Sequence, residues 1–183
     1  MQPIIYDVAV SADGFIAGPN SDVSAFPHSG QIVEDYLARL ASYTTVLMGR
    51  ATYEFGLSQG LPLGANPYPQ MRAIVVSSSL SLPGTDVEVW RDLSSLDALR
   101  TTAPGPIYLC GGGRLASTVA ASGHLTHLSL KRAPVVLGSG VPLFSDTVPQ
   151  GAMTLMSQTD YGGGLLFQAF SFAEADRARA TSS

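Results

Sequence analysis

Residues 107–119 read IYLCGGGRLASTV, and this stretch decides how we expect the chain to fold. An apolar, β-favouring run ends in three consecutive glycines, and a helix-like run follows at once. Glycine weakens the interiors of both strands and helices, so the triplet marks a turn between two elements. Two explanations are open at this point: the turn needs backbone torsions that only glycine adopts easily, or a large ligand approaches the bare main chain.

The same order of apolar strand and helix recurs along the rest of the sequence. We expect strands at residues 3–11, 15–17, 44–49, 72–80, 87–93 and 106–110 and from residue 125 onward, and helices at residues 31–43, 50–57, 94–102 and 114–122. Two late extended runs, 152–160 and 164–172, are typical of a hairpin across the sequence YGGG. This alternation predicts an α/β fold, with a mixed, mostly parallel sheet flanked by helices on both faces and a C-terminal antiparallel hairpin.

Length and composition indicate a single globular domain at residues 1–172, followed by a polar tail at residues 173–183. The net charge of −4 argues against a nucleic-acid partner. No apolar run reaches the roughly 18 residues of a membrane helix, so we expect no membrane contact. The N-terminus has the pattern of a first strand rather than of a signal peptide. Cys110 is the only cysteine, which excludes an intrachain disulfide and fits a cytoplasmic protein.

Several loops that follow the expected strands carry small, hydroxyl-bearing or basic side chains. In an open α/β sheet such loops gather at the carboxyl ends of the strands, where ligands bind. Arg50 and Arg114 each stand next to the start of an expected helix, and the N-terminus of a helix favours an anion. The pair therefore predicts a site for more than one phosphate. Three scattered histidines and one cysteine offer no metal-ligand spacing, so we expect no metal.

Gly111, Gly113 and Ala116 formally match the Rossmann signature G-x-G-x-x-A, but their context does not fit it. That signature requires an acidic residue about twenty positions later. This chain has Lys131 and Arg132 there instead. A phosphotransfer site is disfavoured too, because the glycines are not followed by the lysine of a P-loop. We therefore reject a standard Rossmann site.

An ordered set of motifs resembles known reductases. Residues 46–54, VLMGRATYE, and residues 108–115, YLCGGGRL, resemble the paired cofactor segments of dihydrofolate reductases. With SADGFIA at 11–17 and PVVLGSGVPLF at 134–144, the chain is more closely similar to the reductase domain of bacterial riboflavin synthesis, the RibD C-terminal domain, and to its stand-alone relatives. This resemblance implies a dihydrofolate reductase-like fold, NADPH as the cofactor, and hydride transfer to a small heterocycle such as a pterin or a riboflavin-precursor-like pyrimidine.

The resemblance also implies which residues contact the cofactor. By position these are Gly49, Arg50 and Thr52 at the pyrophosphate and adenosine phosphates; Ser77, Ser78 and Arg114 at the adenosine ribose and its 2′-phosphate; Gly111, Gly112 and Gly113 where the pyrophosphate approaches the main chain; and Ala9, Ile16 and Ala17 beside the nicotinamide ring. The residues at the 2′-phosphate favour NADPH over NADH. The glycine triplet is thereby expected to leave room for a dinucleotide.

The resemblance implies candidate catalytic residues on the substrate side as well. In dihydrofolate reductases a carboxylate on the first long helix holds the substrate ring, and this helix offers Glu34 and Asp35 here. Thr126 resembles the strand threonine that partners that carboxylate. Two solvated helix carboxylates are an equally good interpretation of Glu34 and Asp35. His127 follows Thr126 where the stand-alone relatives more often carry an acidic pair, which leaves the substrate open.

Two functions from different classes therefore stay open. The first is an NADPH-dependent reductase that acts on a small heterocycle. The second is a dinucleotide- or ligand-binding protein of the same fold without turnover, which the lack of a clear substrate carboxylate favours. The late hairpin at 152–172 also suits the pairing of two copies, as in relatives of this family. A plain sheet edge explains it equally well, so a homodimer stays open.

Overall fold

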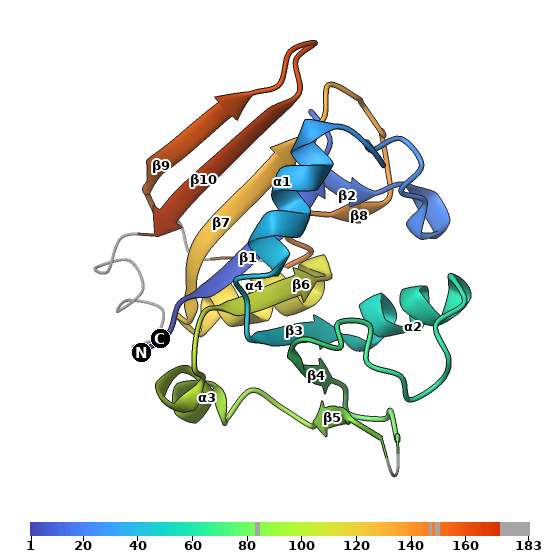
Figure 1. Cartoon of the computed structure of the whole chain (residues 1–183), viewed down its shortest axis with the longest axis vertical. Coiled ribbons are helices and arrows are strands. Elements are labelled where there is room, and N and C mark those ends of the chain that lie inside the picture. The colour runs from blue at the N-terminus through green and yellow to red at the C-terminus, as the bar shows by residue number, and fades with distance from the viewer. Residues whose placement is uncertain (83–84, 147, 149–150, 173–183) are drawn as a thin grey trace.

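The computed structural model describes residues 1–82, 85–146, 148 and 151–172 (Figure 1). The strands in that part are β1 (Ile4–Val10), β2 (Phe15–Ala17), β3 (Thr45–Gly49), β4 (Arg72–Val76), β5 (Val87–Trp90), β6 (Ile107–Gly111), β7 (Leu125–Arg132), β8 (Val141–Pro142), β9 (Met153–Asp160) and β10 (Leu166–Phe172). The α-helices are α1 (Gln31–Leu40), α2 (Arg50–Ser58), α3 (Leu96–Thr102) and α4 (Gly113–Ala121). The expected tail at 173–183 lies outside the described residues.

Eight of these strands form one sheet in the order β5-β4-β3-β6-β1-β7-β10-β9. The first six are parallel, and β10 runs antiparallel to both β7 and β9. The mixed, mostly parallel sheet and its C-terminal hairpin are thus confirmed. β2 and β8 form a separate two-stranded antiparallel sheet, and β8 is not among the expected strands.

The sheet carries a hydrophobic core on each face. Successive strand residues point to opposite faces, so Leu47 of β3 enters one core and Met48 enters the other. Leu99 of α3 and Leu115 of α4 pack into the first core. The second core contains Tyr53 and other residues of the α1 and α2 segments. Helices therefore cover both faces, as predicted. Within the described part of the chain, no helix is long and apolar enough to cross a bilayer.

The strand order brings two helix starts to the same edge of the sheet. β3 and β6 are parallel neighbours, with Met48 opposite Gly111 near their carboxyl ends. α2 begins directly after β3 at Arg50, and α4 begins shortly after β6 at Gly113. The N-termini of α2 and α4 consequently lie beside each other at the carboxyl edge, although the two helices pack on opposite faces.

Asp13 joins the turn after β1 to the loop after β7. Its carboxylate accepts hydrogen bonds from the backbone N–H groups of Leu137 at 3.1 Å and Gly138 at 2.7 Å, and from the hydroxyl of Ser11 at 2.6 Å. The sequence suggests only that Asp13 orders its own turn, but the carboxylate reaches a loop 124 residues further along the chain. Together these hydrogen bonds, that of Ser11 first, lower the pKa of Asp13 from 3.8 to about 2.

We expect Asp13→Asn to lower the melting temperature near neutral pH and to lose this effect in strong acid. A carboxylate with a depressed pKa stabilises the folded state above its unfolded pKa, and the contribution disappears as the pH falls from 3.8 towards about 2. Melting temperatures of both proteins, measured from neutral pH down to that range, test this expectation. Asp86→Asn, at an exposed aspartate, is the control. A difference that stays constant with pH would contradict the assignment.

Candidate functional site

Two adjoining cavities lie at the carboxyl end of the central strands. The first, here called the α1 cavity, has a volume of about 360 Å³ and is bounded by β1, α1 and β7. The second, the α2 cavity, has a volume of about 460 Å³ and extends along α2 to the end of β6. They share the lining residues Val8, Ile16, Val23, Tyr36, Tyr108 and Cys110. The two cavities therefore form one cleft, placed where open α/β sheets bind their ligands.

Five of the twelve residues implied to hold the cofactor line this cleft. They are Ala9 and Ile16 in the α1 cavity, and Ile16, Ala17, Thr52 and Gly112 in the α2 cavity. Gly49 also lies close by, since a Cβ added to it would sit 3.8 Å from the carbonyl oxygen of Gly111. The structure thus brings three separate segments, after β1, β3 and β6, to one place.

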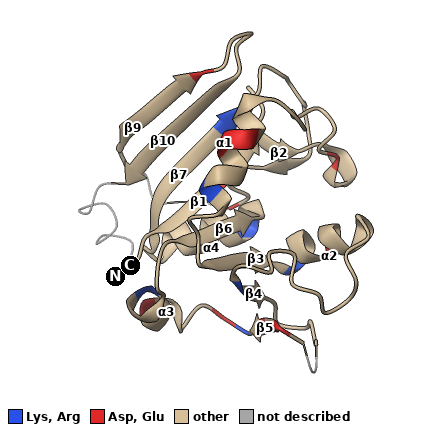
Figure 2. Ribbon diagram, viewed as in Figure 1, with Lys and Arg blue, Asp and Glu red and all other residues tan. Residues whose placement is uncertain are grey.

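The basic and hydroxyl-bearing residues follow the carboxyl ends of the neighbouring strands β3, β4 and β6. Arg50 donates a hydrogen bond to Ser79 at 2.8 Å and pairs with Glu54 at 2.6 Å, which brings the start of α2 to the serine-rich loop after β4. In that loop Ser77 is buried and Ser78 is exposed. Arg114 is exposed in the first turn of α4. Figure 2 shows the Lys and Arg residues spread over several elements, and Arg50 and Arg114 follow the neighbouring strands β3 and β6.

The three glycines have different structural environments. Gly111 has a φ of +118°, which a residue with a side chain rarely adopts. A Cβ on Gly113 would collide with the carbonyl oxygen of Pro142 and would lie 2.7 Å from the hydroxyl of Ser145, so packing against β8 and the segment after it requires this glycine. A Cβ on Gly112 would meet only Thr52 Oγ1, at 3.7 Å. Gly112 is therefore the member of the triplet whose bare backbone faces the open cleft.

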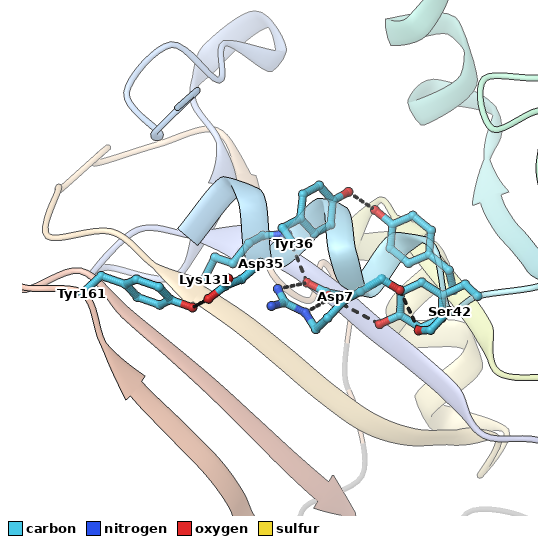
Figure 3. A network of polar contacts seen from close by, with 9 residues as sticks. Asp7, Asp35, Tyr36, Ser42, Lys131 and Tyr161 are labelled. Atoms are coloured by element: carbon cyan, nitrogen blue, oxygen red, sulfur yellow. Dashed lines mark hydrogen bonds and ion pairs between the residues drawn. The ribbon is translucent and has the colours of Figure 1, made fainter. Parts of the chain in front are cut away.

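The candidate catalytic residues do not meet at the cleft. Glu34 is exposed on α1. Asp35 accepts a hydrogen bond from the hydroxyl of Tyr161 at 2.6 Å (Figure 3), and this bond is the main reason why its pKa is lowered. Thr126 is buried near the start of β7, at the opposite edge of the sheet, and donates to the carbonyl oxygen of Ile4 at 2.8 Å. None of the three lines either cavity.

A buried ion cluster that the sequence analysis missed forms part of the α1 cavity (Figure 3). Asp7, in the middle of β1, is 1% exposed. Its carboxylate accepts hydrogen bonds from Arg39 Nε at 2.9 Å, Lys131 Nζ at 3.0 Å and the Tyr43 hydroxyl at 3.2 Å. A charge at this depth requires partners of this kind. The signal in the sequence is an aspartate inside an otherwise apolar strand, together with the only lysine of the chain.

Aromatic hydroxyls and a thiol line the boundary between the two cavities. Tyr36 and Tyr108 share a hydrogen bond of 2.8 Å between their hydroxyl groups, and the Tyr68 hydroxyl lies 3.4 Å from Cys110 Sγ. Burial raises the pKa of Tyr36, Tyr68 and Tyr108 well above the ordinary tyrosine value, and it also raises the pKa of the Cys110 thiol. These groups are therefore neutral hydrogen-bonding partners at physiological pH. Among the described residues, no group of three or more His, Cys, Asp or Glu side chains is placed to hold a metal ion.

Comparison with known proteins identifies a family model and several similar proteins. A family model described as the RibD C-terminal domain matches residues 2–167. A putative riboflavin biosynthesis protein from Shewanella sp. PV-4 has a similar structure, with a TM-score of 0.77, 19% identity, and coverage of 94% of this chain and 99% of that one. The curated protein YyaP of Bacillus subtilis (strain 168), itself described as uncharacterized, is 26% identical over 177 residues, which cover 89% of this chain and 91% of YyaP.

A longer solved protein is similar in part. It is a diaminohydroxyphosphoribosylaminopyrimidine deaminase/5-amino-6-(5-phosphoribosylamino)uracil reductase from Thermotoga maritima, with a TM-score of 0.68 and 15% identity. The match covers 94% of this chain and 57% of the Thermotoga chain. At these identities the two solved structures establish the fold, which is the predicted dihydrofolate reductase-like one.

We expect substitutions of Asp7 and Lys131 to have strongly coupled effects on the free energy of unfolding. Asp7→Asn leaves Arg39 and Lys131 without their carboxylate and should lower the free energy of unfolding by about 3 kcal/mol or more. Lys131→Met leaves Asp7 paired with Arg39 and should cost less. The loss of free energy of unfolding in the double variant should then be at least about 1 kcal/mol smaller than the sum of the losses in the two single variants. Urea unfolding of the four proteins measures this coupling, and strictly additive losses would show that the ion pair contributes nothing.

Proposed function

Since the chain belongs to the RibD C-terminal domain family, we propose that it is an NADPH-dependent reductase that transfers a hydride to a small heterocycle. The family supplies a reductase-type fold related to riboflavin biosynthesis. The observation that carries the proposal is the two-part cleft, which offers one half for a cofactor and an adjoining half for a substrate. We place the activity in the cytoplasm, where the Cys110 thiol would stay reduced.

The α2 cavity and its rim have the chemistry that a dinucleotide phosphate requires. Gly112 leaves its side of the cleft open, and Thr52 adds a hydroxyl group beside it. Arg50 and Arg114 add positive charge at two helix N-termini, where anions are favoured. When bound, NADPH supplies the hydride. The small or apolar residues Ala9, Ile16 and Ala17 leave space for a flat ring near the boundary of the two cavities.

The α1 cavity is the proposed substrate half. Its apolar and aromatic walls suit a flat ring, as in a pterin or a pyrimidine. The Thermotoga protein is named as a 5-amino-6-(5-phosphoribosylamino)uracil reductase, which supports the pyrimidine class. The proposal assigns no step to Glu34, Asp35 or Thr126, because all three lie outside the cleft.

A ligand-binding protein without turnover is the second candidate. Asp7 is the only carboxylate among the described residues that line the two cavities, and its oxygen atoms are already bound by cations and a hydroxyl group. A substrate-holding carboxylate of the expected kind is therefore missing from the cleft. Steady oxidation of NADPH with any heterocycle in a pterin and pyrimidine panel would exclude this candidate.

We expect Arg50→Met to raise the dissociation constant of NADPH about tenfold, because a charge-assisted contact to phosphate is lost. Arg72→Met is the matched control. Both arginines are exposed and each pairs with a glutamate at 2.6 Å, but Arg72 stands at the start of β4, at the far edge of the sheet. Titration of NADPH fluorescence measures both variants. No saturable binding by the wild-type protein at millimolar NADPH would refute the proposed function.

We also propose that two copies pair through β9. All eight residues of this edge strand are exposed, and they include Met153, Leu155 and Met156. An unpaired edge with apolar side chains is a template for another strand. A second β9 fits it, because antiparallel pairing of two identical strands closes around a twofold axis and leaves neither edge free.

We expect Leu155→Lys to convert this dimer to a monomer. The substitution places two like charges near the twofold axis and removes apolar area from the interface. Ala98→Lys, at an exposed position of α3 rather than on β9, should leave the dimer intact. Light scattering at micromolar concentration distinguishes the two states. A monomeric wild-type protein would show that β9 is a plain sheet edge.

A further inference from the structure

We propose that Lys131 selects the ligand of the α1 cavity, and that this ligand is a planar heterocycle with an oxo group or an oxyanion facing Lys131 Nζ. A ring that presents an amino-substituted or cationic edge would be disfavoured. The inference rests on the proposed function only in taking this ligand to be the substrate. It reverses the polarity that the sequence predicts, because Glu34 or Asp35 would have offered a carboxylate to a hydrogen-bond donating ring.

The carboxylate of Asp7 has no capacity left for a ligand. Oδ2 accepts hydrogen bonds from Arg39 Nε at 2.9 Å and from the Tyr43 hydroxyl at 3.2 Å. Oδ1 accepts from Lys131 Nζ at 3.0 Å and from Arg39 Nη2 at 3.5 Å. A carboxylate has about four lone-pair sites, so these four contacts occupy it. A ring N–H or amino group entering the cavity therefore finds no ionised acceptor.

Lys131, in contrast, has a donor available. An ammonium group has three N–H donors. One of them binds Asp7, and Nζ also lies 3.3 Å from the centre of the Tyr36 ring, where a cation is attracted to the ring face. No other acceptor of Nζ is found among the described residues. The lysine side chain is only 13% exposed and lines the α1 cavity, so a ligand is the natural acceptor for its remaining N–H.

The local charge also favours an acceptor. Arg39 and Lys131 together carry two positive charges against the single negative charge of Asp7, within hydrogen-bonding distance. Asp35 lies outside the cavity and is bound to Tyr161 and Gln31 instead. The excess positive charge lies in a partly desolvated site, where it stabilises a carbonyl dipole or an oxyanion more than water would.

The apolar and aromatic lining of the α1 cavity suits a flat ring. Side chains of Phe26, Ile32 and Val33 form apolar walls, and the ring of Tyr36 stands next to Lys131. The hydroxyl groups of Tyr36 and Tyr108 bind each other at 2.8 Å and both also interact with the Tyr68 hydroxyl, so this pair is occupied within the protein. Lys131 Nζ is therefore the ammonium donor that lines the cavity, and an oxo group or an oxyanion on the ring is the acceptor that matches it.

Two pteridines of equal size test the polarity. Lumazine carries oxo groups at the two positions where 2,4-diaminopteridine carries amino groups. In a fluorescence titration without NADPH, we expect the wild-type protein to bind lumazine at least about tenfold more tightly than 2,4-diaminopteridine. The reason is that lumazine accepts one hydrogen bond from the charged lysine and the diaminopteridine does not. Equal or tighter binding of the diaminopteridine, or no binding of either compound, would overturn the proposal.

Variants of Lys131 test the residue. Lys131→Met should weaken lumazine binding about tenfold, and Lys131→Arg, which keeps the charge, should recover part of the loss. Asp7 keeps its bonds to Arg39 and Tyr43 in both variants, so both should fold, which circular dichroism checks. Arg132→Met is the control, because the side chain of Arg132 points to the opposite face of the sheet from Lys131 and donates a hydrogen bond to Gln168. Unchanged lumazine binding by folded Lys131→Met would overturn the proposal.

The test of ligand binding in the α1 cavity can be separated from the test of NADPH binding. NADPH binding is titrated independently on the same proteins. If NADPH fails to bind but lumazine binding depends on Lys131, the reductase proposal falls and the ligand assignment stands. If NADPH binds and the protein does not prefer lumazine, only the assignment of Lys131 falls.

Discussion

The buried carboxylate of Asp7 is the interaction on which the arrangement of the cleft depends. A charge in the middle of a central strand is tolerated only where other groups neutralise it. Here Arg39 comes from α1, Lys131 from β7 and Tyr43 from the segment after α1. One carboxylate thereby ties a covering helix and a neighbouring strand to β1. Because Asp7 and Lys131 also line the α1 cavity, the group that holds these elements together sets the charge of the site.

The order of the strands explains why the cleft has two halves of different character. β1 lies between β6 and β7, so one side of its carboxyl end faces the glycine turn and the start of α2, and the other faces Lys131. The first side offers open backbone and rim arginines, which suit phosphates. The second offers a partly desolvated ammonium group among aromatic walls. The reductase activity that we propose requires this kind of division, with a shared boundary where the cofactor and the substrate meet.

Sequence reasoning succeeded where the controlling forces are local. The alternation of apolar runs with helical runs predicted both layers of helices and the parallel sheet, because burial periodicity is a property of neighbouring residues. It also gathered Gly49, Arg50 and Gly112 at one edge, since strands that precede helices share their carboxyl edge in a parallel sheet. Individual side chains were harder to assign. Gly113 is required by Pro142, and Asp13 binds Leu137 and Gly138, all contacts with distant segments.

The sequence by itself determined the fold class and the family to which the chain belongs, and it placed the starts of α2 and α4 at one edge of the sheet. Only the tertiary structure decided which ionisable groups enter the cleft. Asp35 turned out to face the β9–β10 turn, whereas Asp7 and Lys131, 124 residues apart, came into contact on adjacent strands. The physical reason is that periodicity records whether a residue is buried or exposed, but a charge is accommodated by partners in space. Those partners are known only once strand order and register are set.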